Sequence, residues 1–337
     1  MGAAISLPFI SFFALPALTS YGTSVNLLFF TLNWYILLLT HPPLSVEIIG
    51  ISVVQLLCYI LPALLFLLFD TGLPSIATAI KTQGDIALAG RLGRKRVAKI
   101  AAWSVLNVAL GVALQLALEL LLTKVLRMRT ALSLSKRMPM PWTIAQQALI
   151  LVLVRGILQY YIHRFVLHNP NVFLSKYHVA WQHAIPAPFS ICASYDSPPC
   201  YLLHHWVPLF VPAIAMRAHI LPVLFALAIT SLETLVTYSG YSILPSGILL
   251  PGMAKRVDNH FLVQGQGNYA AFGALDWCHG TSVGRDLVDD MKAEWEKHDG
   301  DAKIQMAGEK AGNLVDGIGD KVRARANAGR KKASGRS

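Results

Sequence analysis

Eleven histidines occur in this chain of 337 residues, and four of them lie in one short stretch, YYIHRFVLHNPNVFLSKYHVAWQH. They form two H-x4-H pairs, His163 with His168 and His178 with His183, and another histidine, His260, follows in KRVDNHFLVQGQGNY. Neutral imidazole binds iron, zinc and copper well. Residues five apart on an α-helix lie about 140° apart around its axis, so each pair suits a helix end or two ligands that reach different metals. We interpret the five histidines as candidate ligands of a metal centre.

His260 lies far along the chain from the other four histidines, with the nearly uncharged region 206–252 between them. One membrane crossing needs about 20 apolar residues, so this region is long enough for two passes or for a re-entrant hairpin. Either arrangement returns the chain to the side from which it started. We therefore expect His260 to meet the other four, whereas an odd number of crossings would separate them.

The composition indicates a protein that lies in a membrane. Hydrophobic residues make up 54% of the chain and charged residues only 14%, against about 25% charged residues in an ordinary soluble domain. The net charge of +11 indicates cytoplasmic loops and lipid headgroups, and no motif of aromatic and basic residues points to nucleic acid. The four cysteines are scattered without a CxxC pair, which favours neither a zinc knuckle nor a disulfide scaffold.

Several apolar segments precede the histidines, and we expect them to form membrane helices. Two basic loops, at about 91–99 and 124–137, flank one of these segments. If that segment crosses the membrane fully, the two loops lie on opposite sides, and one of them breaks the positive-inside rule. The polar tail is expected to start with a short helix, VDDMKAEWEKHD, and to end in a disordered basic stretch. The apolar segments are 5–19, 24–40, 45–69, 98–123 and 142–162.

The order of several motifs resembles the fatty acid hydroxylase / sterol desaturase superfamily over about residues 140–285. These motifs are HRFVLH, KYHVAWQHAIPAPFSICASYDSPP, YSGYSILP and VDNHFLVQGQGNYAAFGALDWCHGTS. The resemblance implies an all-α integral membrane protein, a transmembrane bundle with a histidine-rich helical cap on the cytosolic side of the endoplasmic reticulum. It divides the chain into an N-terminal transmembrane region (1–140), a hydroxylase-like domain (141–285) and a basic tail (286–337).

The resemblance also implies a histidine-ligated di-iron centre, with His163, His168, His178, His183 and His260 as the ligands that remain. Several box positions hold other residues here: Gln182 and Tyr238 stand where the family has histidine, and only His260 survives in the third box. The centre can then hold two metals, one metal, or none. The residues that can substitute for the missing ligands are Gln182, Asp258, Asn259 and Glu233.

The remaining histidines suit other roles. His204 and His205 stand beside Trp206 where the family has no ligand, and we interpret them as residues of the membrane interface. His279 is expected to pack. His219, close to Arg217, is expected to mark either a functional site within the membrane or the turn of a hairpin.

The chemistry implied by the resemblance is O2-dependent oxidation of an unactivated C–H bond in a lipid from the bilayer. Hydroxylation of a fatty acyl chain is favoured over desaturation, with electrons from a separate b-type cytochrome or reductase. A second hypothesis is a lipid-binding or scaffold protein of the same fold whose metal site has degenerated. A transporter that uses Arg217 and Glu233 would need internal repeats, and none is visible in the sequence.

Overall fold

The computed structural model describes residues 20–241 and 251–297, and these residues form helices, loops and two isolated bridges without a strand. The all-α architecture predicted from the sequence is confirmed for this part of the chain. The apolar segment 5–19, the second half of YSGYSILP and the tail from residue 298 lie outside the described residues.

The helices follow one another with short connections. The first half of the chain contains α2 (Ser20–Thr40), α3 (Pro43–Gln55), the π-helix η1 (Leu56–Ile60), α4 (Leu61–Gly72), α5 (Pro74–Ile80), the 3-10 helices η2 (Gly84–Ala87) and η3 (Ala89–Leu92), α6 (Arg94–Leu120) and the π-helix η4 (Leu121–Val125). The second half contains α7 (Pro141–Ile162), the π-helix η5 (His163–Leu167), α8 (Ser175–Trp181), the 3-10 helices η6 (Gln182–Ala184) and η7 (Ser190–Ser194), α9 (Pro198–Tyr201), the π-helix η8 (Leu202–Trp206), α10 (Val207–Ala215), α11 (Ile220–Thr237), α12 (Pro251–Leu262), α13 (Ala274–Cys278) and α14 (Leu287–Lys297).

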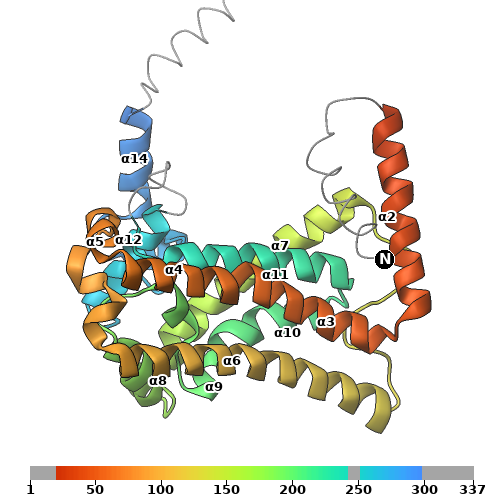
Figure 1. Cartoon of the computed structure of the whole chain (residues 1–337), viewed down its shortest axis with the longest axis horizontal. Coiled ribbons are helices and arrows are strands. Elements are labelled where there is room, and N and C mark those ends of the chain that lie inside the picture. The colour runs from red at the N-terminus through yellow and green to blue at the C-terminus, as the bar shows by residue number, and fades with distance from the viewer. Residues whose placement is uncertain (1–19, 242–250, 298–337) are drawn as a thin grey trace, which may run out of the picture.

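Four continuous helices among the described residues are long and apolar enough to cross a membrane. Three of them coincide with apolar segments expected from the sequence. Two begin with a proline, Pro43 and Pro141, which suits a first turn because its N–H groups have no partner within the helix. Figure 1 shows α3–α4 and α6 lying along a common axis across the molecule. The four candidate spans are Pro43–Gly72, Arg94–Val125, Pro141–Leu167 and Ile220–Thr237.

The region 206–252 forms the expected hairpin over its described part. Helix α10 and helix α11 both pack against α7, and a tight turn at Met216–His219 joins them, with Arg217 at φ 47°. His219 caps α11, since its side chain accepts a hydrogen bond from the backbone N–H of Leu221. The interpretation of His219 and Arg217 as the mark of a hairpin turn is therefore confirmed.

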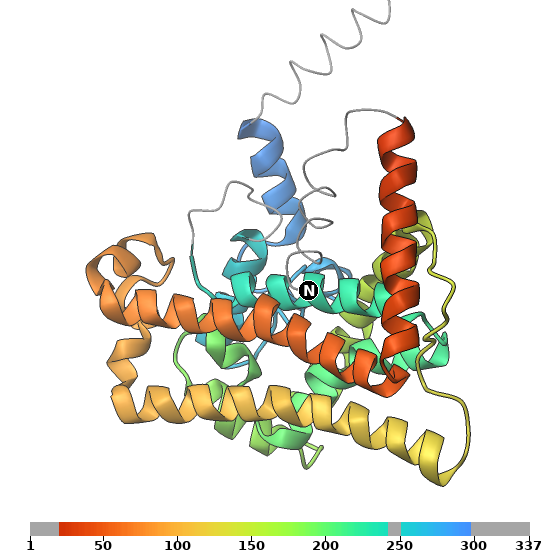
Figure 2. The ribbon, with the colours of Figure 1, turned by 45° about the vertical axis from the view of Figure 1, so that its right-hand side comes forward.

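Helix α2 takes a direction that the sequence did not reveal. The segment 24–40 was expected to span a thin bilayer with tilt, but Figures 1 and 2 show α2 standing across the long axis of α6. Trp34 fastens it: the indole N–H donates to the carbonyl of Ser135 at 2.9 Å, and the ring lies 5.3 Å from that of His219. A tertiary contact of this kind has no signature in local hydropathy.

The buried side chains gather at two ends of the bundle. One cluster includes Tyr59, Phe189 and Phe261, beside the segment 182–197 and α12. The other includes Leu151 and Phe210 and lies towards the hairpin turn. Because α6 runs the length of the bundle without a break, the basic loops before and after it lie at opposite ends (Figure 1). The positive charges therefore assign no side of the membrane.

Candidate metal centre

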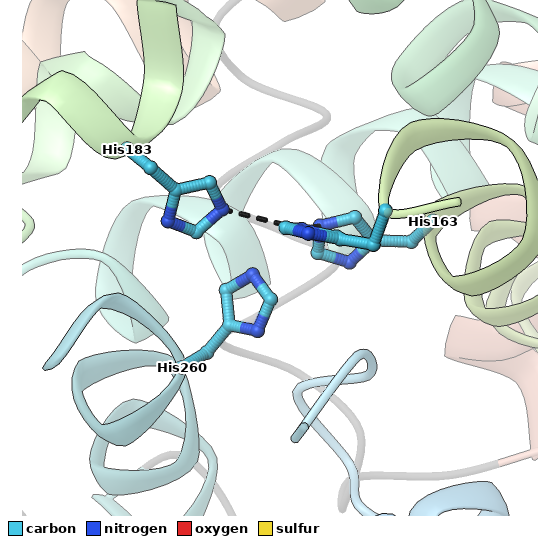
Figure 3. A group of neighbouring side chains, drawn as sticks. His163, His183 and His260 are labelled. Carbon is cyan, nitrogen blue, oxygen red and sulfur yellow. Dashed lines mark hydrogen bonds between the residues drawn. The ribbon is translucent and has the colours of Figure 1, made fainter. Parts of the chain in front are cut away.

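Four histidines from three separate parts of the chain converge on one point. A ring nitrogen of each lies within 4.8 Å of a ring nitrogen of every other, and the four residues are His163, His168, His183 and His260. Figure 3 shows His163, His183 and His260 pointing towards one another from different segments. The hairpin α10–α11 makes this possible because it returns the chain to the end of the bundle that it left.

The π-helix η5 explains how His163 and His168 come together. On an α-helix, residues five apart would diverge, as expected from the sequence. Here the N–H of His168 donates to the carbonyl of His163 at 2.9 Å, the i to i+5 bond of a π-helix, which places residues five apart almost above one another. The two Nε2 atoms lie 3.1 Å apart. This H-x4-H pair thus lies at a helix end, one of the two arrangements expected from its spacing, and the wider backbone turn brings its rings together.

Carbonyl and carboxylate oxygens orient the inward-facing imidazoles from behind. Nδ1 of His163 lies 2.8 Å from the carbonyl oxygen of Tyr269, and Nδ1 of His260 lies 2.6 Å from that of Gly267. A neutral ring that donates through Nδ1 carries its lone pair on Nε2. Nε2 of His260 has no hydrogen-bond partner although it is buried. Free lone pairs that face a common centre are what a metal ion requires.

His178 stands beside the group of four and has the same arrangement. Its Nδ1 lies 2.6 Å from a carboxylate oxygen of Asp196, and its Nε2 is buried without a partner. Its ring centroid is 4.9 Å from that of His168 and 5.3 Å from that of His183. A carboxylate behind a histidine is the usual support of a metal-bound imidazole. Sequence reasoning passed over Asp196, although a carboxylate in YDSPP close to the second pair was visible.

Burial keeps His168, His183 and His260 neutral at pH 7. It lowers the pKa of His260 to about 4 and that of His183 to about 2, and it lowers the pKa of His168 as well. Neighbouring histidines lower the pKa values of His168 and His183 further, since two adjacent imidazolium ions repel each other. The site therefore presents uncharged nitrogen donors, which suit a transition metal such as iron.

The loop after α12 holds the carbonyl groups that orient His163 and His260. Asp276 anchors this loop: its carboxylate accepts the backbone N–H groups of Tyr269 and Ala270 at 2.8 and 2.9 Å and the hydroxyl of Thr281 at 2.7 Å. These contacts give a physical role to the motif GNYAAFGALDWCHGTS. Sequence reasoning had not singled out Asp276.

Gly265 is required where this loop passes the histidines. A Cβ atom at this position would lie 2.1 Å from the Cε1 atom of His168, and the φ angle is +81°. Any larger residue would have to displace the His168 ring from the centre.

Neither Glu233 nor Asp258, the two carboxylates predicted as substitute ligands, joins the group of four histidines. Glu233 instead pairs with Arg155 at 2.9 Å. Both carboxylate oxygens of Asp258 are buried without a partner, beside Gly240, and burial raises its pKa to about 7.

The two amides predicted as substitute ligands differ from each other. The side-chain N–H group of Asn259 donates to the carbonyl of Val283 at 3.3 Å, so this residue helps to hold the loop after α13. Gln182 is buried, and its side-chain oxygen has no partner, so it remains able to contribute an oxygen.

His204 and His205 were interpreted as residues of the membrane interface, but their side chains lie inside the bundle. His204 is buried, with its ring centroid 4.4 Å from that of His163. His205 lies 3.1 Å from the carbonyl oxygen of Ala193 through Nε2. The helical run from Pro198 to Ala215 turns this segment into the bundle, which the neighbouring tryptophan did not reveal. His279 packs as expected, with its ring against Tyr160.

A small cavity lies beside the histidines. Its walls include His163, His204, His260, Arg155, Glu233 and Tyr269. Hydrogen-bonding groups therefore line the space next to the imidazoles, between α7, α11 and α12.

Comparison with known proteins agrees with this architecture. Residues 148–281 match the family model of the fatty acid hydroxylases. All five predicted ligands fall within that match, which is consistent with the fatty acid hydroxylase / sterol desaturase superfamily. No solved structure matches the chain. Together with the four apolar helices, the family supports an integral membrane protein with a general lipid hydroxylase or desaturase type of function.

Proposed function

We propose that the protein is a membrane-bound, O2-dependent lipid oxidase with iron at the histidine centre, and that it hydroxylates a fatty acyl chain or a related lipid. The observation that carries this proposal is the orientation of the rings. His163, His178 and His260 each face an oxygen through Nδ1, and their Nε2 atoms face inwards. Buried nitrogens without partners cost free energy, and a metal ion between the converging rings would supply the missing partner.

The residues present fit iron as the bound metal. Iron would supply the activation of O2 that an unactivated C–H bond requires. The chain's own residues do the rest: imidazole nitrogens hold the metal, Asp196 and the carbonyl groups of Tyr269 and Gly267 orient the rings, and the apolar helices keep bulk water away.

The partners and location follow from the same proposal. Electrons would come from a separate b-type cytochrome or reductase, and the histidine end would face the cytosol from the membrane of the endoplasmic reticulum. We further propose the division into a transmembrane region (1–140), a catalytic domain (141–285) and a basic tail (286–337). The competing function is a lipid-binding scaffold with a degenerate site, which the missing box histidines favour.

Metal content and lipid products together test the proposal. The full-length protein, purified in detergent, is expected to contain iron, and the double variant His163→Ala/His168→Ala is expected to contain at most a tenth as much, since even residues behind the ligands change affinity about 10–100-fold. Cells that produce the wild type should contain a hydroxylated or unsaturated lipid that the double variant does not make.

His279→Ala is the matched control, because His279 lies outside the centre and packs on Tyr160. It should retain both the iron and the product. A wild-type protein that binds no metal even after incubation with ferrous iron would overturn the proposal in favour of the scaffold.

A further inference from the structure

His204 is a buried imidazole next to the centre whose position no family motif explains. It lies on η8, 21 residues after the second histidine pair. Its side chain lines the same cavity as His163 and His260. Within the described part of the chain, no hydrogen bond holds either of its ring nitrogens, in contrast to the five predicted ligands. The residue is only 6% exposed, and the cavity is the side from which a ligand can reach its ring nitrogens.

The neighbouring histidine shows what a structural role looks like here. The ring of His205 lies 4.8 Å from that of His204, and its Nε2 meets the carbonyl oxygen of Ala193. Its ring also stacks on Tyr201, with 5.0 Å between the centroids. His205 is thus satisfied by the protein, whereas His204 faces the other imidazoles.

Six imidazoles lie around the centre. Three of them, His168, His183 and His260, have ring centroids 4.8 to 4.9 Å apart. His163 joins this group to the others: its ring is 4.7 Å from those of His168 and His260 and 4.4 Å from that of His204. His178 lies 5.2 Å from His163 and 6.2 Å from His204. His163 therefore stands between His168 and His260 on one side and His204 on the other, and His204 extends the cluster beyond what one ion needs.

We propose that His204 is a metal ligand specific to this chain, and that it replaces a missing box histidine so that the centre holds two metal ions with three imidazoles each. This inference rests on the proposed function, because it assumes that the centre binds metal. Three protein ligands with an open position are the usual arrangement of a catalytic metal. Of the outcomes left open by the sequence, two metals, one metal or none, the structure favours two.

The test is metal stoichiometry in the full-length protein. The metal-depleted protein is titrated with Co²⁺ and then with Fe²⁺ under anaerobic conditions, and bound metal is counted per chain. The wild type should bind two ions. His204→Ala should bind one ion with unchanged affinity and the second at least 10-fold more weakly. His205→Ala, one residue away, should still bind two.

Each outcome separates this inference from the proposed function. Equal stoichiometry and affinity in wild type and His204→Ala, or a wild type that binds one ion, overturn the role of His204 and leave a metal enzyme. A wild type that binds none removes the proposed function itself. Helix content and the melting temperature of the metal-free variants show whether they fold. If His204→Ala does not fold, His204→Phe fills the space without a donor and must show the same loss of the second ion.

Discussion

Polar side chains are buried at both ends of the helical bundle, and the two ends use them differently. At the end opposite the histidines, Glu47 lies near the start of α3, and Gln115 and Glu119 lie near the end of α6; all three are fully buried. Figure 1 places these helix ends beside α2, far from α8 and α12. Ionisable residues in a membrane span are expected to serve a function, and the partners of the buried polar groups show which function each end serves.

At the carboxylate end, each of the three side chains bonds another part of the chain. The side-chain amide of Gln115 donates to Glu47 at 2.7 Å, and Glu119 accepts the backbone N–H of Ala131 at 2.8 Å, which holds a loop on the bundle. One side-chain oxygen of each residue is nevertheless buried without a partner, so unpartnered polar atoms occur at both ends. At the histidine end, ring nitrogens from three parts of the chain converge within 4.8 Å of one another. Equal burial therefore does not mean an equal role; the convergence of donor atoms distinguishes a ligand site from a structural brace.

The largest effect expected from this comparison follows from removing the negative charge behind His178. Asp196→Asn should weaken metal binding about 10–100-fold, because the carboxylate orients the ring and raises its basicity. The measurement is competition with a chelator of known affinity. Asp85→Asn, at an exposed ion pair with Arg91, is the control and should not change the affinity. Unchanged affinity in Asp196→Asn would mean that His178 is a brace like Glu119.

The second prediction concerns stability at the carboxylate end. Glu119→Leu removes the acceptor of the buried Ala131 N–H group and should lower the free energy of unfolding by about 1–3 kcal/mol. Glu119→Gln keeps an acceptor oxygen and should cost less. Thermal unfolding in detergent checks both, and metal content should equal that of the wild type. A loss of metal in Glu119→Leu protein that remains folded would show that the two ends are coupled.

The smallest effect is a pH dependence at the hairpin turn. Burial lowers the pKa of His219 below 6.5 in the folded protein, so the unfolded chain binds a proton more readily. Its contribution to stability is therefore complete above pH 6.5 and is lost as the pH falls below that value. Protonation also places a hydrogen on Nδ1, which accepts the N–H of Leu221 at 3.3 Å.

His219→Asn supplies a helix cap that does not titrate and isolates this contribution. The decrease in melting temperature between pH 7 and pH 5 should be smaller in His219→Asn than in the wild type. The same slope in both proteins would contradict the assignment. Because the other buried histidines are present in both proteins, the difference between the two slopes belongs to His219 alone.

Local sequence patterns were enough for the class of protein and for most of the site. Long apolar segments predicted the candidate spans, because a helix in a membrane needs an apolar side chain at almost every position. The order of the histidine motifs and of the segments around them carried the resemblance to the fatty acid hydroxylases, whose family model matches residues 148–281. The length of the region 206–252 predicted that His260 would return to the other four.

Tertiary structure decided what local patterns do not encode. Whether the turn after Ile162 winds as an α-helix or a π-helix depends on what its side chains meet, and only the π form brings His163 and His168 together. The roles of Asp196 and His204 depend on elements that are distant in sequence and pack side by side. The hydropathy of α2 indicates that its residues avoid water, but it does not determine the orientation of the helix. The contact of Trp34 with Ser135 is what places α2 across the bundle.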